Sequence, residues 1–176
     1  MGDVKDLDRI SRIYEHPDFM SRLQSIEEAE KDRKFCRHGL AHLLDVARLM
    51  YIDALKDGYI SSGALSREMI YAAAMLHDIG RAEQNAFGTP HHEASAEISR
   101  VIMPACGFDE EETSRVEAAI LAHRGREEGQ SDDRKTDDVL GRLLYKADKA
   151  SRQCYACDAR LACNWPPERM NMKVGL

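Results

Sequence analysis

The sequence lacks any long apolar run and any excess of positive charge. No stretch approaches the roughly 20 consecutive apolar residues that a membrane-spanning helix requires. The first ten residues, MGDVKDLDRI, have no apolar core of the kind found in signal peptides. The formal net charge of −6 argues against a protein that coats nucleic acid. We therefore expect a cytoplasmic protein that binds neither membranes nor nucleic-acid polymers.

Two further scarcities concern crosslinks and strands. The chain has five cysteines, and an odd number without an export signal favours reduced thiols over a disulfide framework. A chain of 176 residues does not need such crosslinks, because it is long enough for one domain with a substantial core. The alternation of apolar and polar residues that is typical of β-strands is missing as well. The sequence thus predicts a single all-α domain.

Apolar residues instead recur at helical spacing in segment after segment. The expected helices cover residues 17–33, 35–56, 66–79, 89–107, 109–124 and 137–152. We divide the chain into a helical extension over 1–34 packed on the core, a helical domain over 35–165 and a tail over 166–176. The polar stretch 125–136 is the one we expect to form a loop.

Seven histidines are distributed over these helices. His16 lies in a polar region and is expected at the surface, whereas the other six fall at helix ends or on faces flanked by apolar residues. Histidine and acidic side chains that converge from several helices are the usual means by which a helical bundle builds a metal site.

The adjacent pair His77 and Asp78 follows the apolar run AAAML. Neighbouring residues on a helix point about 100° apart, so they share one ion only from a helix end. Gly80 supplies that end, and the negative end of the helix dipole favours a cation there. Divalent metals suit a mixed set of imidazole and carboxylate ligands.

Three motifs, in order, resemble the HD superfamily of metal-dependent phosphohydrolases, and the resemblance spans about residues 36–152. HLLDVARL is similar to the first family motif and places His42 as a ligand. LHDIGR is similar to the motif that names the family, with His77 and Asp78, and LYKADKASR to the last one, with Asp148. The resemblance implies a helical bundle with a metal site in its core.

Two more stretches resemble the binuclear members of that superfamily. HHEASAEI is similar to HPEIGAEI of the HD-GYP branch and aligns His91 with a ligand, with His92 as the competitor that would contact substrate. AAILAHRG supplies His123. The YKADK ending and the length look most like symmetrical diadenosine tetraphosphate hydrolases. The chain lacks the Gly-Tyr-Pro stretch of the HD-GYP branch, and Arg124 stands where the diadenosine branch usually has threonine.

The resemblance implies a phosphohydrolase. It would cleave a phosphate ester or anhydride of a nucleotide, dinucleotide or other small phosphorylated metabolite by attack of a metal-activated hydroxide. Two divalent ions are expected, with iron, manganese, zinc, nickel and magnesium not distinguished. The implied metal ligands are His42, His77, Asp78, His91, His123 and Asp148. Asp78 and Arg81 are the catalytic candidates. The substrate-binding candidates are His38, His92, Arg124, Lys149 and Arg152. The sequence leaves open whether the protein forms a homodimer.

Two features leave alternatives open. His38 and His42 have the spacing of two ligands on one helix, but HGLAH lacks the glutamate of metalloproteases. His38 therefore either lines the site or caps a helix start.

The stretch CYACDARLAC contains a CxxC, a spacing used by zinc and iron–sulfur sites. Cys36 could supply a fourth ligand only if the fold brings it near Cys154, Cys157 and Cys163. In the simpler interpretation, Cys154, Cys157 and Leu161 form an apolar helix face; in a third, the segment helps to wall the substrate pocket. The cysteines also define a second function, a catalytically weak metal- or redox-sensing protein.

Overall fold

The computed structural model describes residues 7–123 and 138–174, and every regular element within these ranges is helical. This confirms the predicted all-α class. The expected loop over 125–136 and the candidate Arg124 lie outside the described residues. None of the helices in these two ranges is long and apolar enough to cross a membrane.

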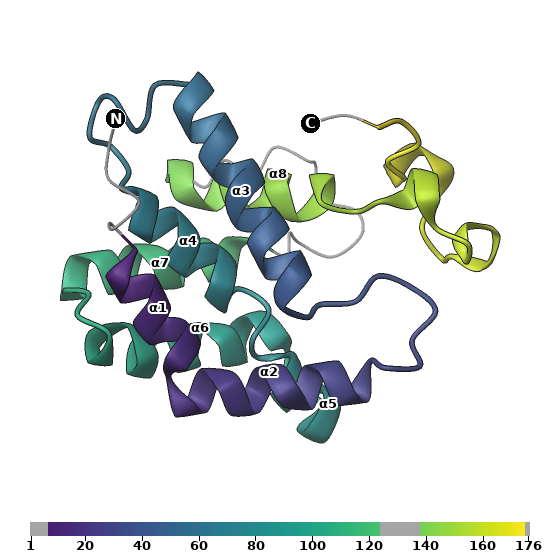
Figure 1. Cartoon of the computed structure of the whole chain (residues 1–176), viewed down its shortest axis with the longest axis horizontal. Helices are drawn as coiled ribbons and strands as arrows, with labels where there is room; N and C mark the ends of the chain where they lie inside the picture. The colour runs from purple at the N-terminus through teal and green to yellow at the C-terminus, as the bar shows by residue number, and fades with distance from the viewer. Residues whose placement is uncertain (1–6, 124–137, 175–176) are drawn as a thin grey trace.

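The helices form a bundle with an irregular C-terminal segment beside it (Figure 1). In chain order they are α1 (Asp8–Glu15), α2 (Pro17–Ala29), α3 (Leu40–Lys56), α4 (Arg67–Leu76), α5 (Arg81–Phe87), α6 (His91–Ala105), α7 (Glu110–Ala122) and α8 (Val139–Ala150). Three short 3-10 turns follow, η1 (Cys154–Ala156), η2 (Arg160–Ala162) and η3 (Pro167–Arg169).

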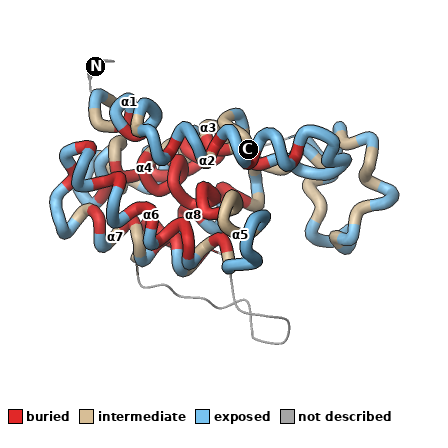
Figure 2. Tube along the Cα trace, turned by 90° about the horizontal axis from the view of Figure 1, so that it is seen from below, coloured by how far each residue is buried: buried red, intermediate tan, exposed pale blue. Residues whose placement is uncertain are grey.

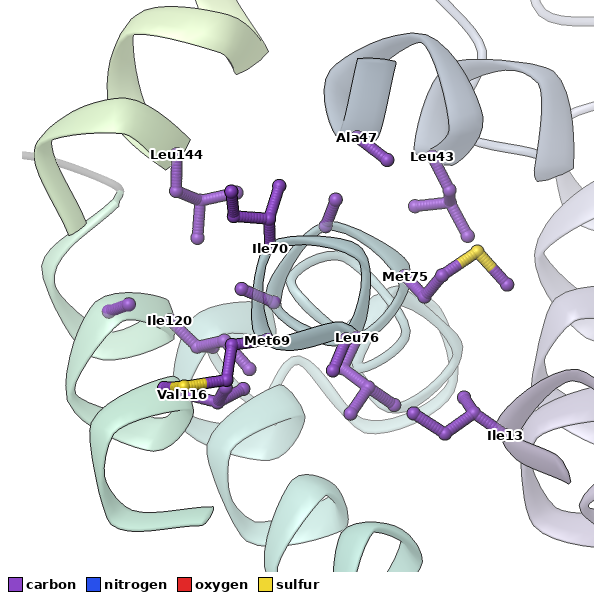
Figure 3. Close-up of a cluster of buried hydrophobic side chains, with 14 of the residues drawn as sticks. Ile13, Leu43, Ala47, Met69, Ile70, Met75, Leu76, Val116, Ile120 and Leu144 are labelled. Carbon is purple, nitrogen blue, oxygen red and sulfur yellow. The ribbon is translucent and has the colours of Figure 1, made fainter. Parts of the chain in front are cut away.

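Helix α4 runs through the centre of the bundle. Ser66 caps its start, because the Ser66 hydroxyl accepts a hydrogen bond from the Met69 amide at 3.1 Å. Apolar side chains of α1, α3, α7 and α8 surround it, as the view of this cluster shows (Figure 3). From Ala72 to Leu76 every residue of α4 is apolar and buried, so burial of this half stabilises the helix. Whatever follows its last residue therefore begins inside the protein.

The ends of the predicted helices needed correction around this point. The helix expected over 66–79 ends at Leu76, and the chain turns before a separate short helix, α5, which the sequence did not predict. Helix α6 begins at His91 with Pro90 as its N-cap residue, without a side-chain cap. The N-terminal helix α1 was also missed, although its Ile13 is fully buried in the common core.

The segment after α8 differs most from expectation. From Ser151 to Val174 no described residue is buried, and Figure 2 shows the same lack of buried positions in this projecting lobe. Leu161 is 97% exposed. The interpretation of Cys154, Cys157 and Leu161 as an apolar helix face is therefore wrong, because the chain forms 3-10 turns here and Leu161 faces solvent.

Candidate metal centre

The carboxylate of Asp78 is the centre of a buried cluster of histidines. It lies in the turn after α4, with His77 at the C-cap, and both residues are buried. Its Oδ2 atom is 3.5 Å from His42 Nε2 and 3.4 Å from His77 Nε2. Its Oδ1 atom is 3.4 Å from His91 Nε2 and 4.0 Å from His123 Nε2. Each carboxylate oxygen thus faces its own pair of imidazoles.

Two of these rings are fixed by the helices that carry them. His77 Nδ1 donates to the Ala74 carbonyl oxygen at 2.7 Å, and His123 Nδ1 donates to the Ile120 carbonyl oxygen. A carbonyl oxygen only accepts, so each Nδ1 carries the ring proton. Each Nε2 therefore presents a lone pair to Asp78.

A hydroxyl fixes His42 in the same tautomer. Ser151 Oγ lies 3.3 Å from His42 Nδ1 and donates its own proton to the Asp148 carbonyl oxygen at 2.8 Å. Because that proton is already used, the bond to His42 runs from Nδ1 to the hydroxyl oxygen. His91 Nδ1 lies 2.8 Å from Gln84 Oε1, an acceptor on α5. Such outer partners orient the ligands of metal sites.

The inner atoms of the cluster are all acceptors. His42 Nε2, His77 Nε2 and both carboxylate oxygens of Asp78 are buried without a hydrogen-bond partner. Lone pairs that face one another in a buried site are costly unless a cation lies between them. Two groups of ligand atoms converge within 4.8 Å, His42 with His77 and Asp78, and Asp78 with His91 and His123. The donor set fits two divalent cations that share one carboxylate.

The protonation states also suit metal ligands. Burial lowers the pKa of His77 and lowers the pKa of His123 to about 4, so both rings are neutral at pH 7. Burial acts to raise the pKa of Asp78, but His77, His42 and Arg81 outweigh it and hold that pKa well below its ordinary value. His77 and His123 are therefore neutral imidazoles beside a charged carboxylate.

Asp148 reaches the His42 side of the cluster from α8. Its Oδ1 is 3.7 Å from His42 Nε2, while its Oδ2 pairs with Lys149 Nζ at 2.7 Å and lies 3.8 Å from Arg152 Nη2. Burial acts to raise the Asp148 pKa, yet His77 and Lys149 bring it below its ordinary value. Arg81 is close to the other carboxylate, with Nε 3.0 Å from Asp78 Oδ2.

Of the adjacent pair at the start of α6, His91 faces Asp78. His92 Nε2 instead lies 3.9 Å from the Glu93 carboxylate. Gly80 lets the start of α6 pack closely on the turn after α4. Its amide donates to Ser95 Oγ at 2.9 Å, and the space beside its Cα is too small for a Cβ atom. The sequence left open which of the two histidines faces the cluster. The packing of α6 on the turn after α4 places His91 beside Asp78.

His38 contacts the cluster only through the ring of His42. Glu30 accepts hydrogen bonds from the His38 amide at 2.7 Å and from its Nδ1 at 2.8 Å, and the ring lies against that of His42. This contact anchors the chain just before α3. Sequence reasoning missed Glu30, Gln84 and Ser151, because no motif marks a residue that acts only through a histidine.

Glu30 provides a test of that anchor. Burial acts to raise its pKa, but the bonds to His38 and the charge of Arg33 bring the pKa below its ordinary value. Such a carboxylate stabilises the fold above its unfolded pKa and loses this contribution as the pH falls through the folded value. We expect Glu30→Gln to cost about 1–3 kcal/mol at pH 7. The cost should shrink below about pH 4.5.

Urea unfolding at several pH values measures this difference. The control is Glu28→Gln, which removes the same charge from an exposed carboxylate paired with Lys31 at 2.7 Å. A cost for Glu30→Gln that stays constant from pH 7 to pH 4 would contradict the linkage.

Comparison with known proteins places this geometry in a family. The model of the HD domain matches residues 39–153, the range that carries His42, the His77–Asp78 pair and Asp148. The chain belongs to the HD-domain family. The match excludes α1 and α2 and ends at Gln153, just before Cys154.

Three other proteins resemble this chain to different extents. An uncharacterized protein from Clostridium beijerinckii is 38% identical over 168 residues, which cover 96% of this chain and 99% of that protein. A crystal structure described as a predicted HD superfamily hydrolase from an uncultured Thermotogales bacterium matches with a TM-score of 0.51 and 27% identity. The match covers 80% of this chain and 72% of the Thermotogales chain. A bifunctional uridylyltransferase/uridylyl-removing enzyme from Gluconobacter oxydans is 32% identical over 90 residues, 47% of this chain and 9% of that protein.

Proposed function

We propose that this HD-domain protein is a two-metal phosphohydrolase. The observation that supports it best is the division of the Asp78 carboxylate, whose two oxygens face two separate pairs of histidines. A carboxylate placed in this way can bridge two cations. The chain offers no other buried acceptor cluster of this kind within residues 7–123 and 138–174.

Each residue would have a distinct role. His42 and His77, with Asp148 on the same side, would hold one ion, and His91 and His123 would hold the other. When bound, two divalent ions lower the pKa of water and neutralise the charge of phosphoryl oxygens. Arg81, Lys149 and Arg152 bring positive charge next to the two aspartates, where it favours an anionic substrate. Arg124, outside the described residues, remains a candidate for the same task.

The substrate class we propose is a phosphate ester or anhydride of a nucleotide, dinucleotide or other small phosphorylated metabolite. Two things support it, namely the sequence resemblance to the symmetrical diadenosine tetraphosphate hydrolases and the partial match to a uridylyl-removing enzyme. The hydrolase name of the Thermotogales structure supports the reaction type. A catalytically weak sensor is the second candidate, because Cys154, Cys157 and Cys163 line a cavity next to His42 and Asp148.

A substrate screen tests the proposal. Purified protein with manganese or cobalt should hydrolyse at least one compound among phosphomonoesters, nucleotides and dinucleoside polyphosphates. His77→Ala should remove that activity, because His77 is one of the buried ligands, while its circular dichroism stays helical. His16→Ala is the matched control, since His16 only caps α2 by accepting from the Asp18 amide. Equal rates in the parent and His77→Ala would refute the assignment to this site.

A further inference from the structure

The irregular segment after α8 has little to hold it in place. It has no buried residue, so it gains little hydrophobic stabilisation to offset the entropy lost on ordering. Its later part has anchors, since the Asn171 amide donates to the Lys149 carbonyl oxygen at 2.8 Å and Arg152 stacks on Trp165 at 3.5 Å. Small lobes without a core are generally held by disulfides or metals.

Three cysteines lie in the part before those anchors. Cys154, Cys157 and Cys163 line a cavity of about 340 Å³ together with Cys36, which precedes α3. Cys36 is 118 positions before Cys154 in the sequence, so the fold alone brings it to this cavity. All four are free thiols. The condition that the sequence left open, that Cys36 comes near the other three, is therefore met.

The spacing and the spread of the thiols distinguish between kinds of metal centre. Zinc sites commonly combine two closely spaced ligand pairs, whereas here three cysteines share one short segment and the fourth is distant. Plant-type iron–sulfur sites also combine one CxxC, a third nearby cysteine and a remote fourth. In the described residues no three cysteine sulfurs lie within 4.8 Å of one another. A single zinc ion bonded at about 2.3 Å would hold them roughly 3.8 Å apart.

We propose that Cys36, Cys154, Cys157 and Cys163 bind an iron–sulfur cluster in this cavity. Ferrous and ferric iron and inorganic sulfide would be taken up from solution in the oxidation states that the cluster holds. Each thiol would lose its proton to solvent as its Fe–S bond forms, and no thiol is oxidised. The cluster would fasten the segment after α8 to the chain before α3. The two sites would share no ligand residue, because the centre at Asp78 consists of imidazoles and carboxylates alone.

The charges around the cavity suit such a cluster. Arg37, Arg152 and Arg160 line it with the thiols, and positive charge stabilises thiolates and the negative cluster that they bind. Burial raises the pKa of the Cys36 thiol, and Arg152 opposes this rise. His42 and Asp148 line the same cavity, so the cluster would lie beside the His42 side of the metal centre.

Acid-labile sulfide provides the decisive measurement, because the centre at Asp78 can hold iron but not sulfide. Full-length protein, purified without oxygen and reconstituted with a mixture of ferrous and ferric iron and sulfide, should contain both iron and sulfide and show the broad visible absorbance of thiolate-bound iron. Serine in place of Cys36, Cys154, Cys157 or Cys163 should cause loss of the sulfide. Cys106→Ala should retain it, since Cys106 lies buried in the bundle core instead of in the cavity. Asp78→Asn should retain it too.

Trypsin supplies a second readout. Arg160 lies between the cysteines, and cleavage after it should be slow in the loaded parent and fast in Cys36→Ser, which leaves the cleaved segment itself unchanged. The proposal is overturned if the protein binds stoichiometric zinc without sulfide. It is also overturned if it takes up no sulfide on reconstitution, or if Cys36→Ser keeps the full amount.

Discussion

Asp78→Asn is expected to abolish hydrolysis, with kcat/KM lower by about 10³-fold or more. The amide keeps the shape of the carboxylate but loses the charge that both groups of histidines share. Its NH2 group would also direct protons at Nε2 lone pairs, which are already fixed toward it by the outer partners of the rings. Both metal positions should therefore be lost by this one substitution.

Metal-dependent stability tests this without reference to any substrate. An ion that binds only the folded state at 100 times its Kd adds about 2.7 kcal/mol, or roughly 5–10 °C in Tm for a chain of this size. We expect added manganese to raise the Tm of the parent but not that of Asp78→Asn. Asp53→Asn, which loses a surface pair with Lys146 at 2.8 Å, should respond like the parent. A full manganese response in Asp78→Asn would mean that the ions bind elsewhere.

The sequence predicted the parts of this centre better than their surroundings. His42, His77, Asp78, His91 and His123 meet in space, because ligands on the inner faces and ends of packed helices leave both periodic and motif signals. Asp148 also lies beside the cluster, 3.7 Å from His42 Nε2. Their roles as ligands remain predictions until metal is measured.

What the sequence did not reveal depends on contacts between distant segments. Helix α5 is only seven residues long and has no buried residue, so no apolar periodicity marks it, yet it carries the Gln84 that holds His91. Likewise, the choice between His91 and His92 depends on how α6 is rotated against the turn at Gly80. The pairing of Cys36 with a segment after α8 is equally invisible to local patterns.

Gly80→Ala is the second substitution for which we expect a large effect. A Cβ atom there would lie 2.4 Å from the His91 carbonyl oxygen and 2.5 Å from the Ser95 amide nitrogen. The φ of −72° suits alanine, so the cost comes from this collision with backbone atoms and not from the conformation of the turn. Overpacking of this kind costs about 1–3 kcal/mol or more. It should lower the Tm by roughly 2–12 °C in this size range.

The collision should also act selectively on the metal centre. Relief requires the start of α6 to move away from the turn, and His91 is its first residue, so the group of Asp78, His91 and His123 should loosen while His42 and His77 keep their places. We expect the bound metal to fall from two ions to one per chain, measured by elemental analysis. Gly39→Ala is the control, because its new Cβ would meet only the flexible Glu27 side chain. If Gly80→Ala unfolds at the parental temperature and still binds two ions, close packing of α6 on Gly80 does not set the position of His91.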